Sequence, residues 1–209
     1  MPVAYRTIVG EAVAEIEAKR SVFRATLARA GSEEEARAAI ERVRAAHRDA
    51  RHHCTAMVIG PQGRLQRTND DGEPAGTAGA PMLEVLCGEG LSDVVAVVTR
   101  WFGGTLLGTG GLVRAYSEAV RAAVADAQVV QREPVEVYQL AVPHADAGRV
   151  EHELRSRGLD LEVDYAEQAV LRFGVGPDQV DGAAALVAQV TGGVVLGDPV
   201  DRGWTDRRL

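Results

Sequence analysis

The chain has 209 residues, of which 46% are hydrophobic and 25% charged, and its formal net charge at pH 7 is −7. This length allows one large domain or two small domains with packed cores. The acidic balance argues against broad nucleic-acid binding, and no apolar run is long enough to span a membrane.

The charge is divided unevenly along the chain. Residues 1–133 carry 16 basic and 17 acidic side chains, which gives a net charge of −1. Residues 134–209 carry 7 basic and 13 acidic side chains, which gives −6. Since an anion is attracted to the less acidic surface, we expect any site for RNA or another anion on the first part of the chain.

The cysteine content and the N-terminal sequence both bear on the cellular compartment. Cys54 and Cys87 are the only cysteines, and the first residues show no basic start followed by an apolar core. Two cysteines without an export signal are typical of reduced thiols in the cytoplasm. We therefore expect a cytoplasmic protein.

Several short elements are predicted before residue 90. Apolar runs bounded by turn residues predict strands at residues 5–9, 13–18, 22–27, 55–59 and 65–68. Ser32 is followed three residues later by Glu35, a capping box that predicts a helix start. This helix is expected to bury Ala36, Ala39, Ile40, Val43 and His47. A second, short apolar helix is predicted at residues 80–87.

Three histidines and a cysteine lie close together in the sequence between these elements. His47, His52, His53 and Cys54 are residue types that bind zinc, but their spacing matches no zinc pattern. Cys54 also directly precedes the apolar strand at residues 55–59. We therefore favour a packed thiol and surface histidines over a metal site.

The central predicted strand covers residues 93–99. Residues 94–98 read Val-Val-Ala-Val-Val, and a β-branched run without alternation predicts a strand covered on both faces. Arg100 follows, and then five glycines occur within nine residues: Gly103, Gly104, Gly108, Gly110 and Gly111.

A helix with apolar residues at helical spacing begins after these glycines. A Gly-rich loop that leads into a helix N-terminus directs free N–H groups towards one place, which attracts anions. The alternative is a tight turn with Thr109 as the N-cap. Neither the P-loop nor the Rossmann fingerprint is present, because Thr109 replaces the P-loop lysine and Val113 the third Rossmann glycine.

An acidic segment precedes the short helix. Asn69, Asp70, Asp71 and Glu73 place three carboxylates within four residues. Such acids could hold a divalent cation, but the calcium-loop spacing is missing, so a turn capped by the aspartates is favoured over a metal. A third role fits better, in which the carboxylates pair with Arg100 and orient its guanidinium group.

The second part of the chain follows a βαββαβ pattern. The preceding helix is expected to stop near residues 132–134, which places the domain boundary between residues 133 and 134. Strands are predicted at residues 135–142, 161–165, 169–175 and 194–196, and helices at residues 145–157 and 177–190. This order is the ferredoxin-like pattern. The tail at residues 204–209 is expected to be mobile.

Two segments carry a resemblance to a known family. The sequences NDDGEPAGTAGAP at residues 69–81 and VVTRWFGGTLLGTGGLVRAYS at residues 97–117 closely resemble the signature of the IMPACT/YigZ family. The resemblance implies a first domain with the fold of the second domain of a small-subunit ribosomal protein, also seen in elongation factor G. It implies a smaller ferredoxin-like second domain, similar to the C-terminal part of elongation factor G.

The resemblance also bears on function. The eukaryotic relatives regulate translation during amino-acid starvation by binding partner proteins, while no agreed reaction is implied for the bacterial branch. We therefore expect an α+β protein with a ribosomal-protein-like domain at residues 1–133 and a ferredoxin-like domain at residues 134–209. A cytoplasmic binding protein of the translation machinery, contacting RNA or protein, without cofactor or metal, is favoured over an enzyme.

The candidate binding residues all lie in the two signature segments. They are Asn69, Asp70, Asp71, Glu73, Thr77, Arg100, Gly103, Gly104, Gly108, Thr109, Gly110, Gly111 and Arg114. In this hypothesis Arg100 contacts a phosphate or an acidic group of the partner. The alternative is an enzyme of phosphate-ester or nucleotide chemistry, in which Asp70 or Asp71 holds a metal or acts as a base. The sequence predicts neither the ligand nor the oligomeric state.

Overall fold

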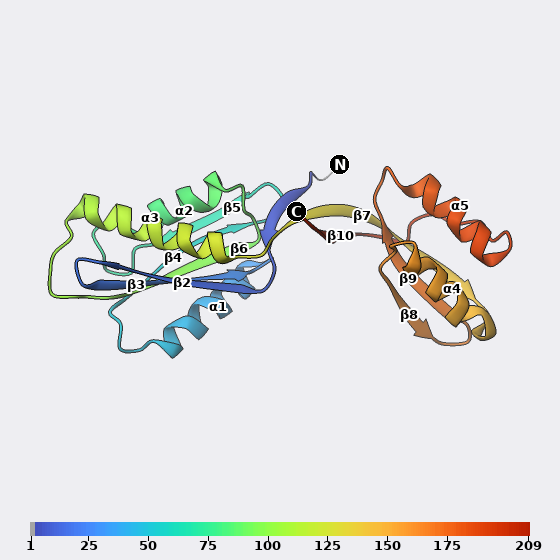
Figure 1. Cartoon of the computed structure of the whole chain (residues 1–209), viewed down its shortest axis with the longest axis horizontal. Coiled ribbons are helices and arrows are strands. Elements are labelled where there is room, and N and C mark those ends of the chain that lie inside the picture. Colours follow the sequence, from blue (N-terminus) through green and yellow to red (C-terminus); the bar gives the residue numbers. More distant parts are fainter. Residues whose placement is uncertain (1–2) are drawn as a thin grey trace. The chain divides into compact units, whose positions relative to one another are not determined.

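The computed structural model describes residues 3–209 and divides the chain into two compact units. The first unit consists mainly of Val3–Gln131 and the second mainly of Arg132–Arg207. Both units mix helices and strands, which confirms the α+β class (Figure 1). Within residues 3–209, no helix is long and apolar enough to cross a membrane.

The first unit is organised around a five-stranded sheet with the order β2-β3-β6-β4-β5. Each neighbouring pair is antiparallel. The central strand is β6, and its side chains alternate between two apolar clusters, Val94, Ala96 and Val98 on one face and Val95 and Val97 on the other. The prediction of a strand buried on both faces is confirmed. The strand bounds are Glu11–Ala18 (β2), Ser21–Arg29 (β3), His52–Ile59 (β4), Leu65–Asn69 (β5) and Val94–Trp101 (β6).

Helices cover both faces of this sheet. Helices α2 (Gly79–Gly88) and α3 (Thr109–Asp126) pack on one face, and α1 (Glu33–Ala46) packs on the other (Figure 1). The predicted capping of α1 is confirmed, because the Ser32 side chain accepts a hydrogen bond from the Glu35 N–H. The Glu35 carboxylate in turn accepts from the Gly31 N–H, so a carboxylate lies at the positive end of the helix.

The second unit has the βαββαβ order predicted from the sequence. Its strands are β7 (Val129–Val142), β8 (Leu161–Tyr165), β9 (Ala169–Val175) and β10 (Asp201–Arg208). Its helices are α4 (His144–Ser156) and α5 (Val180–Thr191). The strands are ordered β10-β7-β9-β8, and both helices contribute to a single apolar cluster with the sheet. This is a ferredoxin-like arrangement.

The helix α3 ends earlier than predicted. It stops at Asp126, not near residues 132–134, and Ala127 is already extended. Strand β7 starts at Val129, pairs with β1 (Tyr5–Ile8) and continues into the second unit. Pro134 does not break this strand, because it precedes the ladder with β9, which begins at Glu136. Pro134 therefore does not mark the end of a helix.

The last strand also differs from the prediction. Residues 194–196 form no strand, and the final strand is β10, which pairs with β7. The expectation of a mobile tail at residues 204–209 was therefore wrong for the residues up to Arg208. The sequence of β10 is polar and has no alternating apolar pattern, so only its pairing with β7 defines it as a strand.

Candidate functional site

Arg100, at the end of β6, is the centre of a buried ion pair. Its Nη1 atom lies 2.6 Å from Oε1 of Glu73, and the two side chains are only 7% and 4% exposed. The guanidinium carbon lies 5.3 Å from the ring centre of Phe23 and 5.6 Å from that of Phe102. The predicted pairing between the acidic segment and Arg100 is thus formed by Glu73. This ion pair holds the acidic segment against the central strand β6.

Two further side chains join this pair. The Tyr116 hydroxyl, on α3, donates to the same Oε1 atom of Glu73 at 2.8 Å. The Cys54 thiol, on β4, lies 3.3 Å from the Tyr116 oxygen and donates to the backbone oxygen of Asp70 at 3.0 Å. We call Cys54, Glu73, Arg100 and Tyr116 the buried polar cluster. It joins the acidic segment to β4, β6 and α3.

The thiol and the phenol of this cluster are held in their protonated forms. The pKa of the Cys54 thiol is raised to about 12, mainly by burial and to a smaller extent by the nearby carboxylates, while the hydrogen bond with Tyr116 acts in the opposite direction. Burial also raises the pKa of Tyr116, as do its contacts with Cys54 and Glu73. At neutral pH both groups are therefore hydrogen-bond donors, and Cys54 is not a nucleophilic thiolate.

Asp70 is the cap of α2, and it does not pair with Arg100 as the sequence had suggested. Its carboxylate accepts hydrogen bonds from the N–H groups of Gly76, Ala78 and Gly79 at 2.7, 3.1 and 2.8 Å. Burial on its own would raise the pKa of Asp70, but these three donors outweigh it, and the pKa is lowered. The capped turn is therefore the role that the geometry shows.

Asp71 points in another direction and also does not pair with Arg100. The carboxylate accepts from the His53 N–H at 2.7 Å and from Nη2 of Arg44 at 3.3 Å. The reason is local: Asp71 has a left-handed φ of 43°, and the Asn69 side chain accepts from its N–H. A turn of this kind directs neighbouring side chains to different places.

The histidines and Thr77 have structural contacts. His53 is buried, contrary to the expectation of a surface histidine, while the expectation of a packed Cys54 is confirmed. Thr77 is also buried, and its hydroxyl donates to the Pro74 oxygen at 2.6 Å. Among residues 3–209, no three His, Cys, Asp or Glu side chains converge in a way that could hold a metal ion.

The Gly-rich loop between β6 and α3 is fixed to the turn between β2 and β3. Lys19 and Arg20 both have left-handed φ angles in that turn. Gly103 lies so close that a Cβ atom there would come within 2.0 Å of the Arg20 backbone. Its N–H donates to the Ser21 hydroxyl at 3.1 Å, and Arg20 donates to Thr105 at 2.9 Å. Gly103 is therefore required for packing.

The other glycines surround the start of α3. Gly104 and Gly108 have φ angles of 83° and 74°, which favour glycine. Gly108, and not Thr109, is the N-cap, and a glycine has no side chain that could make a capping hydrogen bond. The first N–H groups of α3, at Thr109, Gly110 and Gly111, are thus left for water or a ligand. One turn later, Arg114 is exposed.

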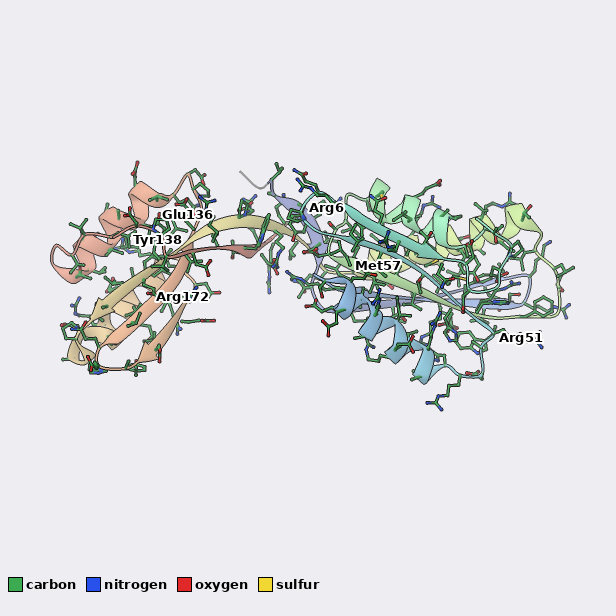
Figure 2. All side chains as sticks on the ribbon, turned by 180° about the vertical axis from the view of Figure 1, so that it is seen from behind. Arg6, Arg51, Met57, Glu136, Tyr138 and Arg172 are labelled. Atoms are coloured by element: carbon green, nitrogen blue, oxygen red, sulfur yellow. The ribbon has the colours of Figure 1, made fainter. Side chains whose placement is uncertain are left out.

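Two large apolar side chains are exposed on the same loop. Phe102 is 51% exposed and Leu106 is 81% exposed. Arg51, which directly precedes β4, lies at the same end of the first unit (Figure 2). We call this region the loop end, defined by the turn at residues 19–20, the loop at residues 102–108 and the first residues of α3, 109–114.

The sequence reasoning missed Cys54 and Tyr116 as site residues. Tyr116 falls at helical spacing on the buried face of α3, and a buried tyrosine hydroxyl needs a hydrogen-bond partner. That need was the available signal for Tyr116. For Cys54, no signal beyond its place in an apolar strand was present.

Comparison with known proteins assigns the chain to a family. The model of the Impact N-terminal domain matches residues 19–124, and that of a domain of unknown function, DUF1949, matches residues 140–194. The chain belongs to the IMPACT family. The first match includes the buried polar cluster and the loop end, so both lie in the part that this IMPACT family member shares with its relatives.

Relatives and solved structures agree with this assignment. The IMPACT family member YvyE of Bacillus subtilis is 38% identical over 191 residues, which cover 91% of this chain and 88% of the relative. YigZ of Escherichia coli is 40% identical over 180 residues, covering 85% and 88%. A crystal structure described as a hypothetical protein is 34% identical, with a TM-score of 0.64 over 99% of this chain and 97% of the other.

Proposed function

We propose that this IMPACT family member is a binding protein of the translation machinery, and that the loop end of its first unit contacts the partner. The observation that carries this proposal is the pair of exposed apolar side chains, Phe102 and Leu106, on a loop that is fixed in place. A rigid loop loses little conformational entropy on binding, so its apolar contacts contribute more fully to affinity.

The surroundings of these side chains favour an anionic partner group. The uncapped start of α3 presents N–H groups and the positive end of the helix dipole. Lys19, Arg20 and Arg114 add exposed cations at the loop end. Residues 1–133 have a net charge of only −1, so this attraction is local. Phosphates of RNA and carboxylates of a protein share this chemistry.

For Arg100 we propose a role different from the predicted contact with a phosphate or an acidic partner group. Its guanidinium is already paired with Glu73 and packs against the rings of Phe23 and Phe102, so a phosphate would have to displace a buried carboxylate. We assign Arg100 to holding the loop end in shape, and we assign the contact with the partner to Phe102, Leu106 and Arg114.

The link to translation rests on the family. Eukaryotic members are expected from the resemblance to regulate translation through partner proteins, and the matching segment covers the loop end. The enzyme alternative has less support, because the oxygens of Asp70 and Asp71 already accept hydrogen bonds from the protein. The raised pKa of Cys54 likewise disfavours it as a nucleophile.

Affinity capture tests this function. The full chain is used to capture partners from a lysate of its source organism, with and without nuclease, beside the variant Phe102→Ser/Leu106→Ser. We expect the wild type to recover ribosomal proteins, translation factors or tRNA, and the variant to recover at least tenfold less. Loss after nuclease treatment assigns the contact to RNA, and persistence assigns it to protein. Recovery of no translation component in either condition, or equal recovery by the variant, overturns the proposal.

A further inference from the structure

The second unit contains a groove at the end of its sheet where β8 begins and β9 ends. The groove has a volume of about 620 Å³ and is lined by β7, β10 and the loops that precede β8 and α5. Val137 is paired with Gly174 across β7 and β9, and Glu162 is paired with Arg172 across β8 and β9. By strand alternation, these four residues face away from the apolar cluster that contains Tyr138 and Phe173. Figure 2 shows Tyr138 and Arg172 on the strands of this sheet.

The charges around the groove are unbalanced. Its two cations are already neutralised, since Arg172 pairs with Asp201 at 2.9 Å and Arg207 pairs with Glu133 at 2.8 Å. Three exposed carboxylates in the lining have no hydrogen bond or ion pair with any residue in 3–209. They are Asp160, Glu162 and Asp178. The unpaired charge of the groove is therefore negative.

The groove also has apolar walls. The half-buried Val137 and Trp204 contribute aliphatic and aromatic surface, and Val135 is buried in the same wall. Gly174 permits the close packing of this wall, because a Cβ atom there would lie 2.8 Å from a Val135 methyl group. Apolar walls in the same groove as Asp160, Glu162 and Asp178, which we call the carboxylate rim, suit a side chain with an apolar stem and a cationic end, which is the character of arginine and lysine.

We propose that this groove binds a basic, extended segment of a partner protein. The aliphatic stem of an arginine or lysine lies against Val137 and Trp204, and its charged end meets Asp160, Glu162 or Asp178. An RNA partner is disfavoured, because residues 134–209 carry a net charge of −6 and phosphates are repelled. This site is separate from the loop end, so it adds a second kind of contact to the proposed function.

Peptide titration of the full chain tests the groove. The probe is a fluorescent eight-residue peptide of alternating arginine and glycine, and the comparison peptide has glutamate in place of arginine. The variant Asp160→Asn/Glu162→Gln/Asp178→Asn removes the rim. The matched control, Glu153→Gln/Glu167→Gln/Asp198→Asn, removes the same charge from residues of the second unit that do not line the groove.

We expect the arginine peptide to bind at least tenfold more weakly to the rim variant and less than twofold more weakly to the control. The variant Phe102→Ser/Leu106→Ser should leave peptide binding unchanged, so failure of the groove is distinguished from failure of the loop end. Equal weakening by both triple variants, binding of the glutamate peptide as tightly as the arginine peptide, or no arginine-peptide binding at millimolar concentration overturns the proposal. Displacement of the arginine peptide from the wild-type chain by an RNA oligonucleotide also overturns it.

Discussion

Arg100 illustrates how a single side chain can be charged and buried at the same time. Its positive charge meets the Glu73 carboxylate, and its guanidinium carbon lies over the rings of Phe23 and Phe102. Removing the arginine leaves the Glu73 carboxylate in an environment that excludes water, and within residues 3–209 only the Tyr116 hydroxyl still donates to it. An unpaired buried charge costs far more than the loss of a surface ion pair.

The variant Arg100→Met should therefore lower the free energy of unfolding by about 3 kcal/mol. The control is Arg37→Met, because Arg37 forms an exposed ion pair with Glu33 on α1 and should cost less than about 1 kcal/mol. Urea unfolding at pH 7 measures both values. In the double variant Arg100→Met/Glu73→Gln, part of the loss should be regained, since no charge is left buried. Similar losses for Arg100→Met and Arg37→Met would contradict a buried pair.

Asp70 makes a stability contribution that depends on pH. Because the pKa of Asp70 is lowered in the folded state, its carboxylate stabilises the fold at pH values above its pKa in the unfolded chain, about 4. This contribution is lost as the pH falls through the pKa of Asp70 in the folded state. Asp70→Asn should cost about 1 kcal/mol at pH 7, and the difference from wild type should shrink below pH about 4.

Urea unfolding at several pH values between 7 and 3 checks this dependence. Glu118→Gln is the control, because Glu118 is exposed on α3 and makes no capping bond. Its difference from wild type should stay near zero throughout. A constant difference between wild type and Asp70→Asn down to pH 3 would show that Asp70 does not cap α2 as a carboxylate.

The two cysteines should react very differently with an alkylating reagent. Cys54 is buried with a pKa of about 12, whereas Cys87 is exposed. Because the thiolate is the reactive form, native protein at pH 8 should be alkylated at Cys87 only, and denatured protein at both. Peptide mass spectrometry distinguishes the two sites. Rapid alkylation of Cys54 in the native protein would mean that the buried polar cluster opens readily.

Among the elements, the ones with a clear local pattern were predicted well. The bounds of β8 and β9 were confirmed to the residue, because β8 alternates apolar and acidic residues and β9 consists mostly of apolar residues. The polar strand β10 was missed, since it depends on pairing with β7, a contact distant in sequence. The same reason explains why α3 ends earlier than predicted. The start of β7 at Val129 depends on its pairing with β1, which is also a contact distant in sequence.

The candidate site was predictable in part. The sequence placed a carboxylate against Arg100, and Glu73 confirms this pairing. It did not distinguish Glu73 from Asp70 and Asp71, because the direction of each side chain depends on the left-handed turn at Asp71 and Gly72. Such a turn rotates adjacent side chains away from one another, and the amino-acid sequence alone does not show this rotation.

The Gly-rich loop can be tested through two of its glycines. Gly103→Ala places a Cβ atom within 2.0 Å of the Arg20 backbone, while a Cβ at Gly110 meets nothing within 4 Å. Gly103→Ala should destabilise the protein by about 2 kcal/mol, and Gly110→Ala should be neutral or slightly stabilising. Thermal unfolding measures the two variants. Equal melting temperatures would show that the loop is not fixed to the turn between β2 and β3.

At the scale of the whole molecule, the two units differ in charge and in the surface they present. The first unit contains a rigid loop end with exposed apolar and cationic side chains, and the second contains an acidic groove. Strand β7 passes from one unit into the other without interruption. A truncation at residue 133 would cut this strand, so tests of either surface are best made in the full chain.

The central claim is that the loop end contacts a partner of the translation machinery, and a pair of arginines on α3 tests it most directly. Arg114 and Arg121 are both exposed, and their spacing of seven residues places them on the same face of the helix, with only Arg114 in the loop end. The measurement is quantitative capture of translation components from a lysate by full chains that carry Arg114→Glu or Arg121→Glu. The account predicts at least a tenfold loss for Arg114→Glu and less than a twofold loss for Arg121→Glu. Equal losses for the two variants, or no loss for either, would contradict it.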